Sequence, residues 1–174
     1  NQGTRNGNNG GWLRLCGRDA TNLSMRIQED RANDNETGHA PELAAVAAFS
    51  QAFDQVGSGQ RPSWEAASAT VNAQNLGASL NFTTVTFANA FSATPLIFSL
   101  PTTEGVPPAS IRFRNISNTG FQVAQFQPQG ETGSHPSMTI DYLAITPGIH
   151  VFPNGSTTLE AGTINSSAFQ GKNT

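Results

Sequence analysis

Two stretches of this chain, about a hundred residues apart, carry the same pattern of apolar and polar residues. Leu13–Leu15 corresponds to Ile111–Phe113 at an offset of 98 residues, and the same offset aligns Thr21–Met25 with Thr119–Val123. Internal repeats constrain a fold strongly, because each copy must form the same supersecondary unit. The chain therefore contains more than one copy of one structural unit, cut out of register.

The repeat predicts how the chain is divided. We expect a flexible N-terminal segment at 1–11, the C-terminal half of a first repeat at 12–53, a linker at 54–63, a complete copy at 64–152, and a linker with the first strand of a following copy at 153–174. A half copy leaves strand edges and an apolar face uncovered. We therefore expect a neighbouring molecule, or chain absent from this sequence, to complete residues 12–50.

Composition and turn spacing predict an all-β fold. Only 12% of residues are charged, and Phe is the dominant large apolar residue. Short runs separated by turn residues indicate an antiparallel six-stranded β-sandwich in the complete copy, beside a partial second copy. Its predicted strands are Ala67–Asn72, Leu80–Phe87, Leu96–Leu100, Ile111–Ile116, Phe121–Phe126 and Met138–Ile145.

The first half-repeat predicts three more strands. Leu13–Cys16 and Leu23–Ile27 are joined by a turn at 18–21, and Leu43–Phe49 is expected to be a strand because its counterpart is Thr139–Ile145. In the complete copy, Asn118–Gly120 predicts a hairpin in which Gly supplies a positive φ. The expected core side chains are Phe82, Phe98, Phe113, Phe121, Val123 and Ile140.

Several of these stretches together resemble the H-type lectin domain. The likeness rests on Phe87, Phe91–Ile97, Ile111–Phe113, Asn118–Val123 and Ile140–Ile145. It implies a six-stranded antiparallel sandwich that binds galactose-type sugars and assembles into trimers or hexamers. Sugar recognition in that family uses an arginine entering the fourth strand and a Trp-His pair after the fifth. The matching positions here are Pro108 and Pro128-Gln129, so the family's sugar site is not carried over.

The first half-repeat resembles a second kind of domain. Leu13–Arg18 and Ile27–Glu42 are similar to a repeat of large surface proteins of Gram-negative bacteria, including accessory proteins of mannose-sensitive haemagglutinin pili. Both resemblances imply a secreted or cell-surface adhesion module rather than an enzyme. We therefore expect an extracellular module that binds a glycan or another cell-surface ligand. The alternative is a structural subunit of a filament or pilus-like assembly that self-associates by exchanging strands.

One loop is the predicted ligand site. Gln127, Gln129, Glu131 and His135 lie in the loop that carries the sugar site in the resembling family, and amide and carboxylate groups pair with sugar hydroxyls. The aromatic platform expected beside them is missing. A plain surface loop is the other interpretation.

The acidic loop at 28–42 has two interpretations. Asp30, Asp34 and Glu36 are candidate ligands for calcium, which prefers several oxygen ligands from one loop. Alternatively, the loop is solvated and forms salt bridges with arginines. The arginines concerned are Arg14, Arg18, Arg26 and Arg31. No other cofactor is expected.

Other function classes have little support in the sequence. The three histidines lack the context of a catalytic triad, the net charge of −3 argues against a nucleic-acid partner, and no apolar run is long enough to span a membrane. Cys16, the only cysteine, has three interpretations. It is a buried small hydrophobe, a partner for a missing half-repeat, or the site of an intermolecular bridge.

Overall fold

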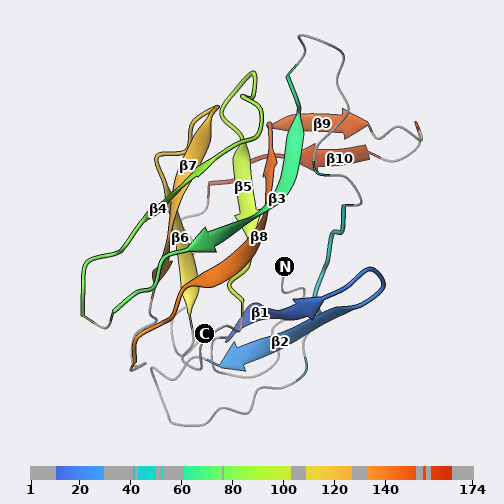
Figure 1. Cartoon of the computed structure of the whole chain (residues 1–174). Helices are drawn as coiled ribbons and strands as arrows, with labels where there is room; N and C mark the ends of the chain where they lie inside the picture. The colour runs from blue at the N-terminus through green and yellow to red at the C-terminus, as the bar shows by residue number, and fades with distance from the viewer. Residues whose placement is uncertain are drawn as a thin grey trace.

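The chain folds entirely into antiparallel β-sheets over the residues that the structure describes. This computed structural model describes residues 11–29, 41, 43–49, 52, 61–75, 77–102, 109–126, 133–151, 155 and 158–165. Ten strands lie in this part of the chain, and they form two three-stranded and two two-stranded sheets (Figure 1). No helix long and apolar enough to cross a membrane occurs among these residues.

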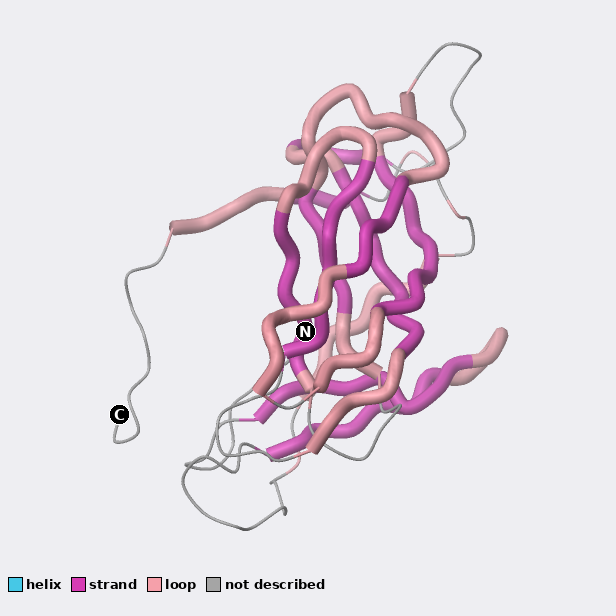
Figure 2. The backbone as a smooth tube through the Cα atoms, turned by 60° about the vertical axis from the view of Figure 1, so that its left-hand side comes forward, coloured by secondary structure: helices cyan, strands magenta, loops and turns pink. Residues whose placement is uncertain are grey.

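All six strands expected in the complete copy are present. They are β3 (Trp64–Val71), β4 (Thr83–Thr86), β5 (Leu96–Ser99), β6 (Ser110–Arg114), β7 (Gly120–Phe126) and β8 (Met138–Ile145). The first three-stranded sheet has the order β3-β8-β5, and the second has the order β4-β7-β6. Figure 2 shows the strands of both sheets running side by side along the long direction of the body.

One core cluster is shared by the two three-stranded sheets. Val85 of β4 and Phe121 of β7 are buried together with Ile140 and Tyr142 of β8. Phe121 makes edge-on ring contacts with both Tyr142 and Phe113, at centroid distances of 5.1 and 5.6 Å. Side chains alternate across each strand, so each sheet has an inner apolar face and an outer face.

Two of the six expected core side chains lie elsewhere. Phe121, Val123 and Ile140 are buried, and Phe113 packs against the cluster half-buried. Phe98 is 51% exposed, because β5 directs Ile97 rather than Phe98 into the core. Phe82 is half-buried outside the cluster. Side chains alternate along the strand, so Val85, three residues later, points to the inner face and Phe82 to the outer face.

The hairpin between β6 and β7 differs from its expected geometry. Asn115 adopts the positive φ, at 51°, and Gly120 does not. A Cβ on Gly120 would collide with the carbonyl oxygen of Val85. Gly120 is therefore required for the close approach of β7 to β4 and not for its own backbone angle.

The first half-repeat forms one hairpin against the body. β1 (Gly11–Arg18) pairs with β2 (Leu23–Glu29), as the sequence predicts. The carboxylate of Asp19 accepts hydrogen bonds from the backbone N–H groups of Thr21 and Asn22 and so stabilises the turn. These bonds lower the pKa of Asp19 to about 2.

The strand expected at 43–49 does not form. Apart from one isolated bridge residue, these positions are not assigned to a strand, and Leu43 and Val46 are 69% and 55% exposed. Its counterpart β8 lies between β3 and β5, whereas none of the ten strands in the described part of the chain pairs with this alanine-rich segment. Cys16 is exposed at a bulge in β1, so its interpretation as a buried hydrophobe is wrong.

The C-terminal part forms a second hairpin. β10 (Thr158–Ala161) pairs with β9 (Gly148–Val151), which immediately follows β8. Ala161 packs with Trp64 and Ile145 of the body. The expected segments at 1–10 and 54–60 lie outside the described residues.

The packing differences predict a large loss of stability for one phenylalanine substitution and a small loss for another. Phe121→Ala should lower the free energy of unfolding by roughly 3–5 kcal/mol, because it leaves a cavity in the shared core. Phe98→Ala should cost less than about 1 kcal/mol, because half of that side chain is already in water. Chemical denaturation of both variants measures these values, and equal losses would contradict the assigned inner and outer faces.

Candidate functional site

The outer face of the β4-β7-β6 sheet carries an open polar groove. Its volume is about 260 Å³, and it ends at the hairpin between β6 and β7. The lining residues are Thr84, Val85, Thr86, Asn115, Ser117, Thr119, Gly120, Phe121 and Gln122. Six of the nine lining residues carry a hydroxyl or amide group, and none of the nine is charged. Such groups both donate and accept hydrogen bonds, which suits a neutral polyhydroxylated ligand.

Gln122 organises the floor of the groove. Its Oε1 accepts hydrogen bonds from Nε of Arg114 at 2.8 Å and from Nδ2 of Asn115 at 3.0 Å. Its Nε2 donates to Oγ1 of Thr84 on the neighbouring strand at 3.2 Å. Because three strands contribute to this network, the antiparallel register β4-β7-β6 fixes it.

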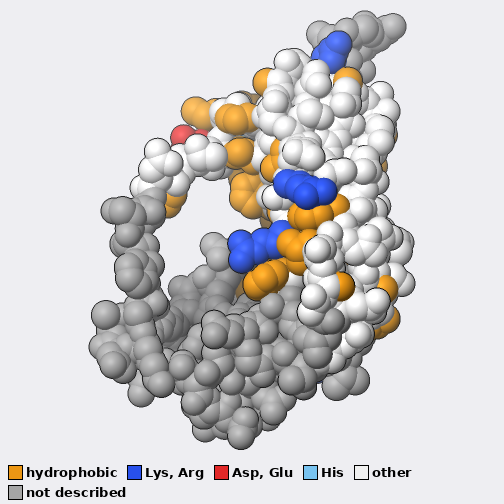
Figure 3. All heavy atoms as spheres, turned by 90° about the vertical axis from the view of Figure 1, so that its left-hand side faces the viewer, with side chains coloured by type: hydrophobic (Ala, Val, Ile, Leu, Met, Phe, Trp, Pro, Cys, Tyr) orange, Lys and Arg blue, Asp and Glu red, His pale blue; other side chains and the backbone are white. Residues whose placement is uncertain are grey.

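Two arginines extend the polar surface beyond the groove. Arg112 and Arg114 of β6 point outward, and each guanidinium lies over an aromatic ring. The distance to the ring centroid is 4.6 Å for Arg112 over Phe126 and 3.5 Å for Arg114 over Phe82. Figure 3, which faces this side of the molecule, shows basic side chains lying on hydrophobic ones. Stacking of this kind orients a guanidinium while its N–H edge stays accessible.

The predicted ligand loop is only partly described. Gln127, Gln129 and Glu131 lie outside the described residues. His135 is described, and its side chain is 1% exposed. A ligand on the surface therefore does not reach the His135 ring in this conformation.

His135 instead belongs to a buried polar cluster with Arg14 and Gln125. Its backbone forms two hydrogen bonds with that of Gln74, while neither ring nitrogen has a hydrogen-bond partner. Gln125 donates through Nε2 to the carbonyls of Asn72 and Pro136, and its Oε1 has no partner. Burial, and then the positive charge of Arg14, lower the pKa of His135.

Arg14 attaches the β1–β2 hairpin to the body. It is completely buried, and its Nε donates to the carbonyl oxygen of Thr102 at 2.8 Å while Nη1 donates to Oε1 of Gln28 at 2.6 Å. Burial lowers the pKa of Arg14 to about 10, and Arg26 contributes to the shift. The backbone N–H of Leu15 also donates to the carbonyl of Pro101.

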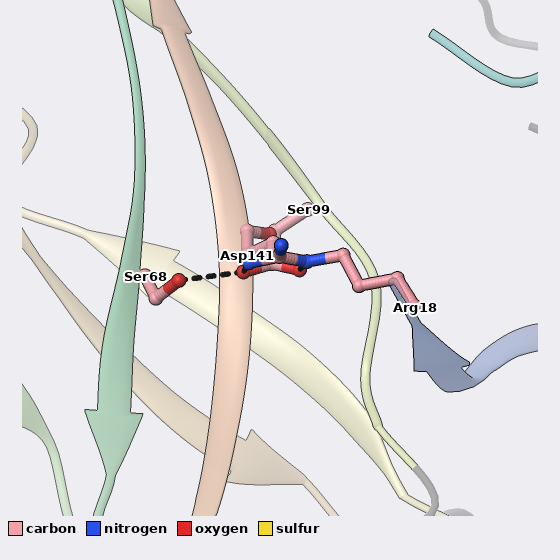
Figure 4. Close-up of polar contacts among 4 residues, drawn as sticks. All are labelled: Arg18, Ser68, Ser99 and Asp141. Atoms are coloured by element: carbon pink, nitrogen blue, oxygen red, sulfur yellow. Dashed lines mark hydrogen bonds and ion pairs between the residues drawn. The ribbon is translucent and has the colours of Figure 1, made fainter. Parts of the chain in front are cut away.

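A second attachment lies on the outer face of the β3-β8-β5 sheet. Arg18 pairs with Asp141 through two hydrogen bonds of 2.5 and 2.9 Å, and the hydroxyl of Ser68 donates to the same carboxylate at 2.6 Å (Figure 4). Ser99 donates to the backbone carbonyl of Asp141. The hydrogen bonds from Arg18 lower the pKa of Asp141. Arg18, for which the sequence predicted a salt bridge with the acidic loop, forms one with Asp141 of β8, and the loop residues Asp30, Asp34 and Glu36 lie outside the described residues.

The predicted calcium ligands are not described. Asp30, Asp34 and Glu36 all lie outside the described residues. Within the described ranges, no group of three or more His, Cys, Asp or Glu side chains is arranged to hold a metal ion. The calcium interpretation of this loop stays a prediction.

Comparison of the chain with protein-family models, with curated proteins and with solved structures gave no match. The residues of the candidate site must therefore be interpreted from their own geometry. Alternation along Ile111–Ile116 puts Arg112 and Arg114 on the face of the strand opposite Ile111 and Phe113, but the sequence indicates no role for them. Two features of the sequence could have identified this surface: the alternation of basic and apolar residues along β6, and the aromatic residue Phe126 at the end of β7.

The buried His135 ring predicts a pH-dependent stability. Its folded-state pKa lies below the ordinary value of about 6.5, so the unfolded state binds the extra proton first as pH falls. The free energy of unfolding should therefore decrease below about pH 6.5, with a slope of up to about 1.4 kcal/mol per pH unit from this residue.

The variant His135→Leu should lack this part of the pH dependence. The free energy of unfolding of both proteins is measured by denaturation at about pH 7.5 and about pH 5. The contribution of His135 is the difference between the two proteins in how much this free energy changes with pH. Asp141 does not interfere, because its lowered pKa acts only at more acidic pH. Identical slopes in the two proteins would show that the His135 ring titrates in water.

Proposed function

We propose that this protein is an extracellular binding module that attaches to a glycan or another cell-surface ligand through the outer face of the β4-β7-β6 sheet. The observation that carries the proposal is the open groove lined by hydroxyl and amide groups. Sugars are recognised by such groups together with adjacent apolar surface. The exposed Thr84 and Thr119 hydroxyls flank Gln122 in this groove.

The strand order supports a closer assignment of the fold. We propose that β3 to β8 form one six-stranded sandwich of the kind found in H-type lectin domains. The two sheet orders β3-β8-β5 and β4-β7-β6, and the core cluster that both sheets share, are consistent with such a sandwich. Fold analogy does not transfer a ligand site, so the proposed surface rests on its own residues.

Removing two groove hydroxyls should weaken ligand binding. We expect the double substitution Thr84→Ala and Thr119→Ala to reduce affinity for the best ligand on a glycan array roughly five- to a hundredfold. Each neutral hydrogen bond contributes about 0.5–1.5 kcal/mol. The matched control is Thr70→Ala with Thr158→Ala, which removes two exposed hydroxyls from other sheets and should leave the affinity unchanged.

A third variant distinguishes this surface from the loop predicted from the sequence. Gln127→Ala, Gln129→Ala and Glu131→Ala together should retain binding. If this loop variant loses binding while the groove variant retains it, the ligand site belongs to the loop. If the full chain binds no glycan on the array, the glycan-binding proposal is wrong.

A structural subunit of a filament is the alternative function. Ile149 and Val151 on β9 are 71% and 63% exposed, and this two-stranded sheet has no further strand beside it in the described part of the chain. Exposed apolar strand edges favour association between chains. The contacts that Arg14 and Arg18 make within the chain argue against strand exchange at residues 11–29.

The mass in solution separates the two functions. A binding module should sediment as one species over a wide range of concentrations. Concentration-dependent fibres that disappear in the variant Ile149→Ser with Val151→Ser would favour the filament.

A further inference from the structure

Arg112 and Arg114 have no anionic partner among the described residues. The ion pair between Arg18 and Asp141 is the only salt bridge within the described residues, and neither Arg112 nor Arg114 contacts a carboxylate there. Arg114 uses its Nε for the neutral amide of Gln122, and Arg112 has no hydrogen bond to the described protein. Most of their N–H donors therefore face solvent.

The described residues around both arginines are neutral. The outward positions beside them on β7 are Gln122 and Ala124, and those on β4 are Thr84 and Thr86. Two outward residues of one strand lie about 7 Å apart, so both guanidinium groups can contact one ligand. The described residues of this face thus carry positive charge, although the chain as a whole carries a net charge of −3.

Both guanidinium groups are held in place before any ligand binds. Stacking on Phe126 and Phe82 restricts their rotation, and the Gln122 amide fixes the Nε edge of Arg114. A preorganised group loses less conformational entropy when it binds. The planar fork of a guanidinium matches the paired oxygens of a carboxylate or a sulfate group.

We propose that the outer face of the β4-β7-β6 sheet selects an anionic glycan, whose carboxylate or sulfate group is bound by Arg112 and Arg114 while its hydroxyl groups occupy the adjacent groove. This inference rests on the proposed function and adds the chemical class of the ligand. Two arginines suit a glycan with separated anionic groups better than a nucleic acid, which requires a larger basic surface.

One oligosaccharide in three chemical forms tests the inference on the full chain. A heparin-derived hexasaccharide carries sulfate and carboxylate groups, its desulfated form carries carboxylates, and its desulfated and carboxyl-reduced form is neutral. We expect the two anionic forms to bind at least about tenfold more tightly than the neutral form, since hydrogen bonds to charged groups are the stronger ones. Single-stranded DNA should bind more weakly than either.

The double variant Arg112→Gln with Arg114→Gln should remove this preference, measured as the ratio of the affinities for the anionic and neutral forms, since Arg114 also hydrogen-bonds Gln122 in the groove. Arg112→Lys with Arg114→Lys keeps both charges but loses the fork, so it should recover only part of the preference. Arg26→Gln is the control for general electrostatic attraction, because it removes one positive charge from an exposed position on β2. Thermal unfolding of each variant verifies that these exposed substitutions leave the fold intact.

Three results would overturn the inference: equal binding of the anionic and neutral forms, an undiminished preference in the Gln variant, or tighter binding of DNA. Equal binding that is lost in the Thr84→Ala and Thr119→Ala variant would leave the proposed function standing without the anionic preference. Absence of binding to all three forms and to the glycan array would instead remove the proposed function itself.

Discussion

The buried carboxylate of Glu65 links the β3-β8-β5 sheet, in which it lies, to the chain just after β4, and the rest of the structure depends on this contact between the sheets. The hydroxyl of Tyr142 on β8 donates to Oε1 of Glu65 on β3 at 2.7 Å, and Oε2 of the same carboxylate accepts the N–H of Ala88, just after β4, at 2.9 Å. Burial, and then Glu65, raise the pKa of Tyr142. A buried carboxylate is tolerated only when its oxygens are paired. The Tyr142 ring also packs on Phe121 of β7 and on Phe87, which follows β4, so this residue contacts the second sheet as well.

The candidate binding face depends on that core through alternation along single strands. On β6 the inward Ile111 and Phe113 pack against the core, and the outward Arg112 and Arg114 face solvent. Packing of the inner face therefore fixes the positions of Arg112 and Arg114 relative to Gln122 and Thr84 on the neighbouring strands. A binding surface on sheet strands keeps its geometry better than one on loops. The surface combines neutral hydrogen-bonding groups with oriented cations, and together these define the chemistry that we propose for the ligand.

The sequence predicted the strands well because alternation and turn residues are local signals. All six strands between Ala67 and Ile145 form, and the hairpin at residues 11–29 forms as its repeat counterpart suggested. The prediction that the repeat gave for residues 43–49 was wrong. The counterpart β8 is a central strand because β3 and β5 pair with it, and a shared sequence pattern does not provide such neighbouring strands. The site was harder to predict. The outward direction of Arg112 and Arg114 follows from alternation, but their stacking on Phe126 and Phe82 depends on the register of three strands. Likewise, nothing local indicates that His135 lies beneath the surface.

We propose the outer face of the β4-β7-β6 sheet as the ligand-binding surface, and a nuclear magnetic resonance titration of the isotope-labelled full chain with the anionic hexasaccharide tests it. We expect the largest chemical-shift changes at Thr84, Arg112, Arg114, Thr119 and Gln122. Residues on the opposite sheet, such as Ser68 and Asp141, should not respond. Changes concentrated at residues 127–135, or on the β3-β8-β5 sheet, would contradict this proposal.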